Sequence, residues 1–137
     1  MKLMHEEITG RIRQTAYEIH CYLGCGFLEK VYRNALTHRL RKQGMRVEPE
    51  KAILVRDEDG TVLGEYFADH MVDDLVVIEV KAVASLCGEH VAQVLNYLKA
   101  TGKEVGLLIN FGSPRFQFRR VVRSEDRAHS AFRASLP

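Results

Sequence analysis

Residues 75–82 form an unusual strand pattern: Leu-Val-Val-Ile-Glu-Val-Lys-Ala is almost continuously apolar but contains Glu79 and Lys81. Such a strand, here expected over 75–81, is typical of a sheet centre, where both faces are buried. Strand side chains alternate between the two faces, so Glu79 and Lys81 project from the same face. Because burial of an isolated charge is costly, this pair needs partners or a purpose. Two interpretations are open: an ion pair or a strand end that reaches solvent, and a functional site.

The rest of the chain alternates between helical and strand periodicity. Apolar residues recur at helical spacing over 4–22 and over 28–40, and glycines follow both stripes. The Asp-Gly pair at 59–60 lies between two strand patterns and predicts a hairpin turn. The further elements that we expect are strands over 52–55, 62–72, 75–81, 105–111 and 116–122, and a helix over 88–100. The order α-α-β-β-β-α-β-β describes a single α/β domain over residues 1–137, with a short basic tail from about residue 123.

The composition, with 46% apolar and 28% charged residues in a chain of 137, fits one globular domain. The longest apolar runs are strand-sized, whereas a membrane span needs about 20 residues. The N-terminal residues reach acids before an apolar stretch develops, unlike a secretory signal. We therefore expect a soluble, cytoplasmic protein. Three cysteines, Cys21, Cys25 and Cys87, cannot all pair within the chain, and we expect small, buried, reduced thiols.

The segment 113–137 is basic, because it holds six arginines against Glu125 and Asp126, while the net charge of the whole chain is +2. A cluster of arginines attracts phosphates, although a solvated basic tail explains the charge equally well. The candidates for contacts with a nucleic-acid backbone are Arg115, Arg119, Arg120 and Arg123.

Asp69, in the strand before Glu79, bears on the two interpretations of the central strand. A two-residue loop at 73–74 places Asp69 opposite Ile78, on the wrong face. A three-residue loop places Asp69 opposite Glu79, on the face of Lys81. A functional site therefore requires an odd-numbered loop or a bulge between these strands.

Two converging carboxylates and a backbone carbonyl are hard oxygen ligands, which suit Mg²⁺ or Mn²⁺. Such an ion would explain why charges are tolerated in a buried strand. It would lower the pKa of a bound water and neutralise charge that grows on a phosphoryl group. We expect Lys81 to offset that charge, since a lysine of ordinary pKa, about 10.4, needs a large downward shift before it acts as a base.

Longer stretches of the sequence resemble a known group of enzymes. Asp69, nine intervening residues and then Glu79-Val80-Lys81 resemble the PD-(D/E)XK nuclease superfamily. Further segments are similar to the small bacterial GxxExxY proteins, a branch named after the glycine, glutamate and tyrosine of the second helix: 24–32, 68–69, 78–83, 93–102 and 106–112. The resemblance spans residues 5–122. It implies the restriction-endonuclease-like fold, a central mixed sheet of about five strands flanked by helices.

The resemblance implies roles for the strand residues that match the superfamily pattern. Asp69 and Glu79 match its metal ligands, and Val80 contributes its carbonyl. Lys81 matches the catalytic lysine of the superfamily.

The resemblance also implies roles for helix residues. Glu29 matches an additional acid that a helix supplies to the site, although a solvent-facing acid in the first helical turn explains it equally well. Gln93 and Tyr97 match a glutamine and a tyrosine that help to hold phosphate, water or Lys81. Without the match, an ordinary exposed helix face is the simpler explanation, and we expect His90 to pack or to bond locally.

Together with these residues, the resemblance implies a metal-dependent nuclease that hydrolyses phosphodiester bonds, in DNA in preference to RNA, with Mg²⁺ or Mn²⁺ as its cofactor. A chain of this length has little room for a target-reading domain, so a sequence preference would come from a partner or a second subunit, in a homodimer or a larger complex. The alternative is a catalytically silent nucleic-acid-binding or protein-interaction module that keeps the fold. Metal-dependent cleavage that requires Asp69 and Lys81 distinguishes the two.

Overall fold

The computed structural model describes residues 5–123, and its elements follow the order that the sequence predicts. They are α1 (Glu6–Leu23), α2 (Glu29–Lys42), β1 (Val47–Arg56), β2 (Val62–Val72), β3 (Val76–Lys81), α3 (Gly88–Thr101), β4 (Val105–Asn110) and β5 (Gln117–Val122). The expected start of the first helix at residue 4 and the basic tail beyond residue 123 lie outside the described residues. Across residues 5–123, no helix combines the length and the apolar character needed to cross a membrane.

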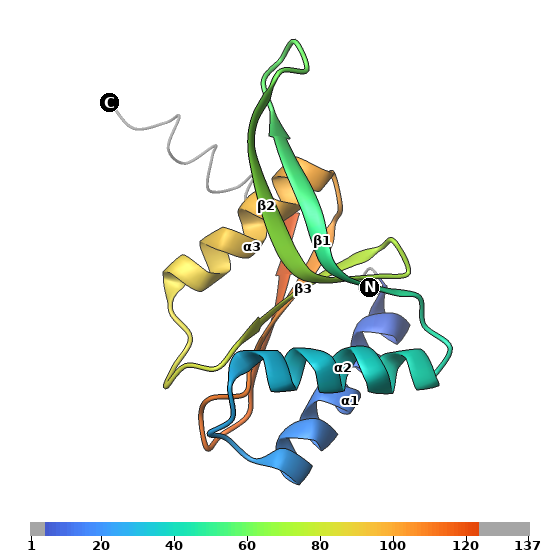
Figure 1. Ribbon diagram of the computed structural model, residues 1–137, viewed down its shortest axis with the longest axis vertical. Helices are drawn as coiled ribbons and strands as arrows, with labels where there is room; N and C mark the ends of the chain where they lie inside the picture. The colour runs from blue at the N-terminus through green and yellow to red at the C-terminus, as the bar shows by residue number, and fades with distance from the viewer. Residues whose placement is uncertain (1–4, 124–137) are drawn as a thin grey trace.

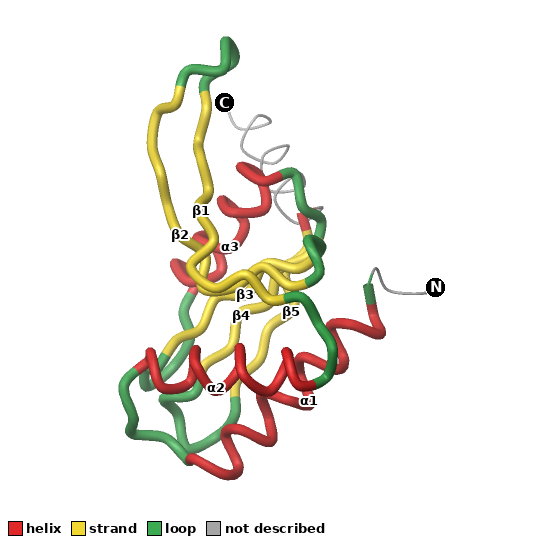
Figure 2. The backbone as a smooth tube through the Cα atoms, turned by 45° about the vertical axis from the view of Figure 1, so that its right-hand side comes forward, coloured by secondary structure: helices red, strands yellow, loops and turns green. Residues whose placement is uncertain are grey.

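The five strands of the described chain form one mixed sheet in the order β1-β2-β3-β4-β5, so β3 is its central strand (Figure 2). β3 and β4 run parallel and are connected through α3, whereas the other neighbouring strands are antiparallel. Residues 76–80 are all buried. The prediction of a central strand with both faces covered is therefore confirmed.

Helices cover both faces of the sheet (Figure 1). α1 and α2 pack on one face, in a cluster that includes Ile78 and Val80 of β3. α3 packs on the other face, in a cluster that includes Val77. Because strand side chains alternate, Glu79 and Lys81 are directed to the α3 face.

β1 and β2 form a long hairpin whose far half extends beyond the rest of the sheet (Figure 1). The sequence pattern predicts that the first strand begins at residue 52, but β1 begins at Val47. The pattern is interrupted by Pro49, with a glutamate on each side of it. A proline is tolerated there because β1 is an edge strand of the sheet. Val47 is buried and pairs with Val72, which makes residues 47–51 part of the strand.

The expectation of buried thiols is wrong. Cys21, Cys25 and Cys87 are free, as expected, but all three are exposed. They lie near helix ends, in the last turn of α1, in the loop that follows it and at the N-cap of α3. These positions are outside the apolar stripes that face the core.

Candidate active site at the end of the central strand

The loop between β2 and β3 has an odd number of residues, as is required for Asp69 and Glu79 to lie on the same face of the sheet. Val72 pairs with Val76 across the loop, so residues 73–75 form it. Continued along both strands, this register brings Asp69 opposite Glu79. The predicted odd-numbered loop is confirmed, and the two acids lie at the same level of the sheet.

β2 and β3 part just before this level. Their ladder ends at Ile78, and beyond it the Val80 N–H donates a hydrogen bond to Asp69 Oδ2 at 2.7 Å. A side chain thus takes the place of a backbone carbonyl. The Lys81 carbonyl points to β4, where it accepts a hydrogen bond from the Phe111 N–H. Since successive carbonyls of a strand alternate in direction, the Val80 carbonyl points to β2 and the Asp69 carboxylate.

Glu79 is the buried acid of the site, with 4% of its surface exposed. Burial raises the pKa of Glu79 to about 9, and a hydrogen bond and charge repulsion from Asp69 add to the increase. The ammonium group of Lys81 acts in the opposite direction on the pKa of Glu79. Two carboxyl groups and a lysine therefore meet at the end of β3, where a cation would relieve the repulsion between the acids.

Tyr32, the tyrosine of the GxxExxY pattern, holds the start of α2 in place. Its hydroxyl donates a hydrogen bond to the Gly24 carbonyl at 2.6 Å and accepts one from the Phe27 N–H at 3.2 Å. Its ring stacks on Phe111, which follows β4, with the ring centroids 4.7 Å apart. These contacts fix the first residue of α2, Glu29, relative to the sheet.

Glu29 is connected to the site through Arg33, one turn further along α2. Arg33 Nη1 lies 3.1 Å from Glu29 Oε1 and 3.4 Å from Asp69 Oδ1. The side chain of Glu29 is 37% exposed, against 13% for Asp69. Glu29 therefore lies at the rim of the site, with a guanidinium between the two acids. Arg33 is not predictable from the sequence pattern, because a contact between residues 36 positions apart leaves no periodic signal.

α3 contributes Gln93 and Tyr97 to the other side of the site. Gln93 Nε2 donates a hydrogen bond to Tyr97 Oη at 2.9 Å. Burial raises the pKa of Tyr97 to about 12, and the negative charge of Glu79 adds to the increase. Tyr97 is therefore a buried neighbour of Glu79 and not part of an ordinary exposed face. His90 bonds locally, as expected: its Nδ1 accepts a hydrogen bond from the Cys87 N–H at 3.1 Å.

Asn110, which the sequence analysis did not single out, anchors the segment that connects Lys81 to α3. It is fully buried. Its Oδ1 accepts hydrogen bonds from the N–H groups of Val83 and Gly112, both at 3.0 Å. Its Nδ2 donates to the Val83 carbonyl and to Gln117 Oε1, both at 2.9 Å. A polar residue at the end of an apolar strand is the signal that could have identified it.

The four arginines expected to contact a nucleic-acid backbone do not gather around the acids. Arg119 and Arg120 are consecutive residues of β5, so they project from opposite faces of the sheet. Arg115 lines a surface hollow on the α1 side. Arg123 forms an ion pair with Glu104 next to the start of β4, whereas the acids lie at the other end of the parallel strands. Their role in binding stays a prediction.

The donor atoms at the end of β3 fit a hard divalent cation. Asp69 and Glu79 offer carboxylate oxygens, and the Val80 carbonyl is directed the same way, which is an all-oxygen set suited to Mg²⁺ or Mn²⁺. Residues 5–123 contain no group of three or more His, Cys, Asp or Glu side chains that could hold a metal ion. A metal ion here would therefore complete its coordination with the carbonyl and with water, as Mg²⁺ commonly does.

Comparisons with known proteins agree with this architecture. The crystal structure of SSO0001 matches with a TM-score of 0.58 and 22% sequence identity, over 91% of this chain and 62% of that chain. The present chain thus spans less than two thirds of SSO0001. An alkaline exonuclease, LHK-Exo from Laribacter hongkongensis, matches with a TM-score of 0.52 and 15% identity, over 98% of this chain and 81% of that chain. These similarities confirm the expected fold, a mixed five-stranded sheet flanked by helices.

At the level of sequence, no curated protein matches the chain significantly. A family model does: that of the PD-(D/E)XK nuclease superfamily matches residues 6–121, which include every element from α1 to β4. The chain belongs to the PD-(D/E)XK nuclease superfamily.

Proposed function

We propose that the protein is a metal-dependent nuclease that hydrolyses phosphodiester bonds, in DNA in preference to RNA, at the site formed by Asp69, Glu79 and Lys81. The observation that carries the proposal is the register that brings Asp69 opposite Glu79, together with the Asp69–Val80 hydrogen bond where the strands part. Membership of the superfamily supports it. The similarity of the fold to that of an alkaline exonuclease points to the same class of reaction.

The strand residues provide the metal site and a fixed charge. Asp69, Glu79 and the Val80 carbonyl would hold Mg²⁺ or Mn²⁺, which supplies a Lewis acid and a bound water of lowered pKa. Lys81, which lies close enough to Glu79 to influence its pKa, offsets negative charge that develops on the phosphate.

The α3 residues provide a hydrogen-bond donor. With a pKa of about 12, the Tyr97 hydroxyl keeps its proton at neutral pH. Since Gln93 Nε2 donates to Tyr97 Oη, that oxygen accepts from Gln93, and its own hydrogen is directed to the Glu79 side chain, with which the hydroxyl also forms a hydrogen bond. We propose that Tyr97 would donate this hydrogen to a phosphate oxygen or to a water once Glu79 holds a metal ion, and that Gln93 holds the phenol in position.

We also propose that the chain is one of the GxxExxY proteins within this superfamily. Gly26, Glu29 and Tyr32 carry the resemblance, and the hydrogen bonds of Tyr32 give the pattern a structural purpose at the start of α2. Sequence preference in the substrate is expected to be weak unless a second subunit or another partner provides it.

A second candidate function is a nucleic-acid-binding module that keeps the fold without the reaction. The contact between Arg33 and Asp69 favours this candidate, because the guanidinium already provides a cation for the carboxylate. If Asp69 held a metal ion, Arg33 would share this carboxylate with the ion or would bind a substrate phosphate.

Cleavage assays separate the two candidates. Purified protein is incubated with single-stranded DNA, double-stranded DNA and RNA, in Mg²⁺, in Mn²⁺ and in EDTA. We expect metal-dependent cleavage that is lost in Asp69→Asn and in Lys81→Met. The matched controls are Asp59→Asn, at the exposed hairpin tip, and Lys42→Met, at the end of α2, which should cleave like the wild type. Binding without cleavage in either metal would contradict the catalytic proposal and favour the module.

A further inference from the structure

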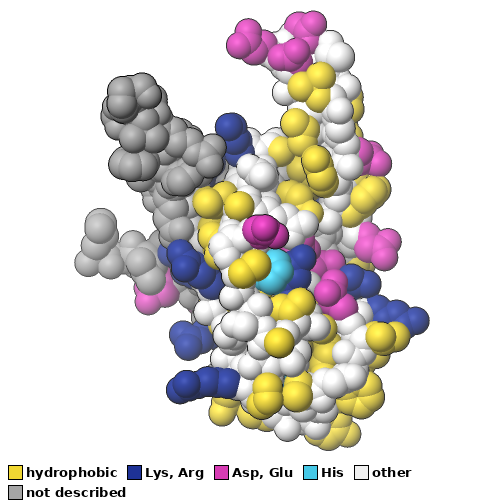
Figure 3. Space-filling model, turned by 90° about the vertical axis from the view of Figure 1, so that its left-hand side faces the viewer, with side chains coloured by type: hydrophobic (Ala, Val, Ile, Leu, Met, Phe, Trp, Pro, Cys, Tyr) yellow, Lys and Arg dark blue, Asp and Glu magenta, His cyan; other side chains and the backbone are white. Residues whose placement is uncertain are grey.

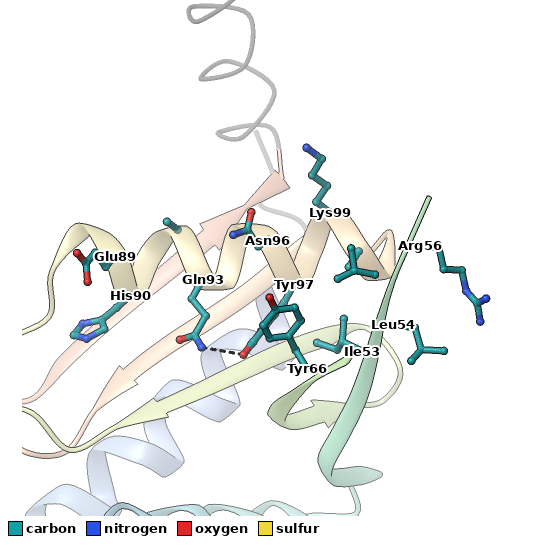
Figure 4. Close-up of a pocket in the computed structure, with 13 residues that line it drawn as sticks. Ile53, Leu54, Arg56, Tyr66, Glu89, His90, Gln93, Asn96, Tyr97 and Lys99 are labelled. Carbon is teal, nitrogen blue, oxygen red and sulfur yellow. Dashed lines mark hydrogen bonds between the residues drawn. The ribbon is translucent and has the colours of Figure 1, made fainter. Parts of the chain in front are cut away.

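A groove lies between the β1–β2 hairpin and α3 (Figure 4). Its volume is about 980 Å³. The hairpin contributes residues 53–56 and Tyr66, and α3 contributes residues between 89 and 100. Of this lining, only Gln93 and Tyr97 have a part in the proposed hydrolysis, so the groove extends well past the acids.

The lining combines apolar surface, an accessible aromatic ring and positive charge at one end, and it includes Glu89 at the other end (Figure 4). Ile53 and Ala92 are among its apolar residues. The Tyr66 side chain is 55% exposed and turns toward the groove (Figure 4). Arg56 and Lys99 are exposed and lie at the same end of the groove. Unpaired bases stack on exposed rings while their phosphates stay near cations, whereas a duplex hides the faces of its bases. The lining therefore suits a single strand.

The groove is continuous with the candidate active site. The ring of Tyr66 lies 6.3 Å from that of Tyr97, and Tyr97 is influenced by the charge of Glu79. From Gln93 to Lys99, α3 rises about 9 Å. At about 3.4 Å per stacked nucleotide, this length accommodates about three nucleotides.

The charge on the hairpin indicates how a strand would lie. Acidic side chains gather at the tip of the hairpin, at residues 57–59, while apolar side chains lie along its arm (Figure 3). Phosphates are repelled by the acids of the tip and attracted by Lys99, and also by Arg56, which lies beside the tip and donates a hydrogen bond from Nη1 to the Gly60 carbonyl at 3.0 Å. A strand would therefore follow α3 and leave the groove beside Lys99, without passing over the tip.

We propose that this groove binds single-stranded nucleic acid, with a base stacked on Tyr66 and phosphates near Lys99 and Arg56, and that it leads the strand to the acids at the end of β3. The inference rests on the proposed function, for which it identifies an unpaired strand as the substrate. Binding requires neither metal nor turnover, so it is measured separately from cleavage.

The test is fluorescence anisotropy in EDTA with short labelled single-stranded DNA, RNA of the same sequence and the corresponding DNA duplex. Single strands should bind more tightly than the duplex. Tyr66→Ala should weaken single-strand binding by about 10-fold or more, whereas Tyr22→Ala, which removes a 78% exposed tyrosine of α1, should have little effect. Lys99→Ala should reduce the slope of log affinity against log salt by about 0.7, and Lys42→Ala should leave it unchanged.

Tyr66→Phe keeps the ring and should bind like the wild type. Preference for the duplex, or equal affinities of folded Tyr66→Ala and Tyr22→Ala, would overturn the inference. The more tightly bound of the two single strands identifies the polymer. Single-strand binding that depends on Tyr66, without cleavage in any metal, would support the groove and contradict the proposed hydrolysis. Duplex cleavage that Tyr66→Ala leaves unchanged would support the hydrolysis and contradict the groove.

Discussion

Asp69 Oδ2 accepts a hydrogen bond from the Val80 N–H at 2.7 Å, at the point where β2 and β3 separate. The other oxygen of the same carboxylate, Oδ1, lies 3.4 Å from Arg33 Nη1. One side chain thus completes the backbone bonding of the central strand and presents an acid to the site. The geometry of the site is therefore maintained by the fold itself.

Asp69→Ala should destabilise the protein by about 1–3 kcal/mol, because it leaves the Val80 N–H without its acceptor in a buried strand. Asp69→Asn keeps an acceptor oxygen and should cost less. Urea denaturation measures both free energies of unfolding. Glu65→Ala, which removes an exposed acid of the same strand, is the control. Equal losses for Asp69→Ala and Glu65→Ala would contradict a structural role for the carboxylate.

The stability of the metal-free protein should fall as the pH rises from about 4.5 toward 9. Glu79 has a pKa of about 9 in the folded protein and an ordinary value of 4.5, so between these values the folded form binds the proton and the unfolded form does not. Raising the pH therefore favours unfolding, with a limiting slope of about 1.4 kcal/mol per pH unit. Thermal melts in EDTA should show a flatter profile for Glu79→Gln. Glu65→Gln is the control. If the pH profiles of Glu79→Gln and Glu65→Gln are equally steep, Glu79 is not the origin of the pH dependence.

His70 should make the protein sensitive to acid. It is buried beneath α2, where its Nε2 lies 3.1 Å from the Arg33 carbonyl and 2.9 Å from Thr37 Oγ1, and burial lowers its pKa from the ordinary 6.5. Below about pH 6.5 the unfolded chain takes up a proton that the folded histidine does not, so stability falls as the pH falls.

Glu79 changes the stability in the opposite direction over the same pH range. The effect of His70 is therefore measured as the difference in stability between the wild type and a His70 variant. The gap in urea midpoint between wild type and His70→Gln should narrow from pH 7 to pH 5. The exposed His38, replaced in the same way, is the control. A gap that stays constant would show that His70 does not titrate as its burial requires.

The main features of the fold follow from local signals in the sequence. The apolar run before Lys81 identifies the central strand. The length of the loop between β2 and β3 decides whether Asp69 lies opposite Glu79, and the sequence leaves two lengths open. Contacts between distant elements leave no such signal. Arg33 reaches the site only because α2 packs across the sheet, and the start of β1 is masked by Pro49 and its charged neighbours. The arginines of β5 are close in sequence but separated in space by the alternation of the strand.

Gly112→Ala should disturb the segment that leaves the central strand. A Cβ atom at Gly112 would lie 2.3 Å from the Ala82 carbonyl carbon and from the Val83 nitrogen, which are backbone atoms and cannot turn aside. We expect a loss of about 1–3 kcal/mol. Gly10→Ala is the contrasting variant: nothing lies within 4 Å of a Cβ atom there, and alanine within α1 should stabilise the protein by about 0.5–1 kcal/mol. Urea denaturation measures the free energy of unfolding of both variants. An unchanged free energy for Gly112→Ala would contradict the close approach of the Ala82 and Val83 backbone to Gly112.

We propose that the carboxylates of Asp69 and Glu79 together bind a divalent cation. Isothermal titration calorimetry with Mn²⁺, in the absence of nucleic acid, tests this without relying on activity. We expect the wild type and Asp59→Asn to bind Mn²⁺ at one site, and Asp69→Asn and Glu79→Gln to bind it at least 10-fold more weakly. If the folded wild-type protein binds no Mn²⁺, or if either substitution leaves the affinity unchanged, the two carboxylates do not form a cation site.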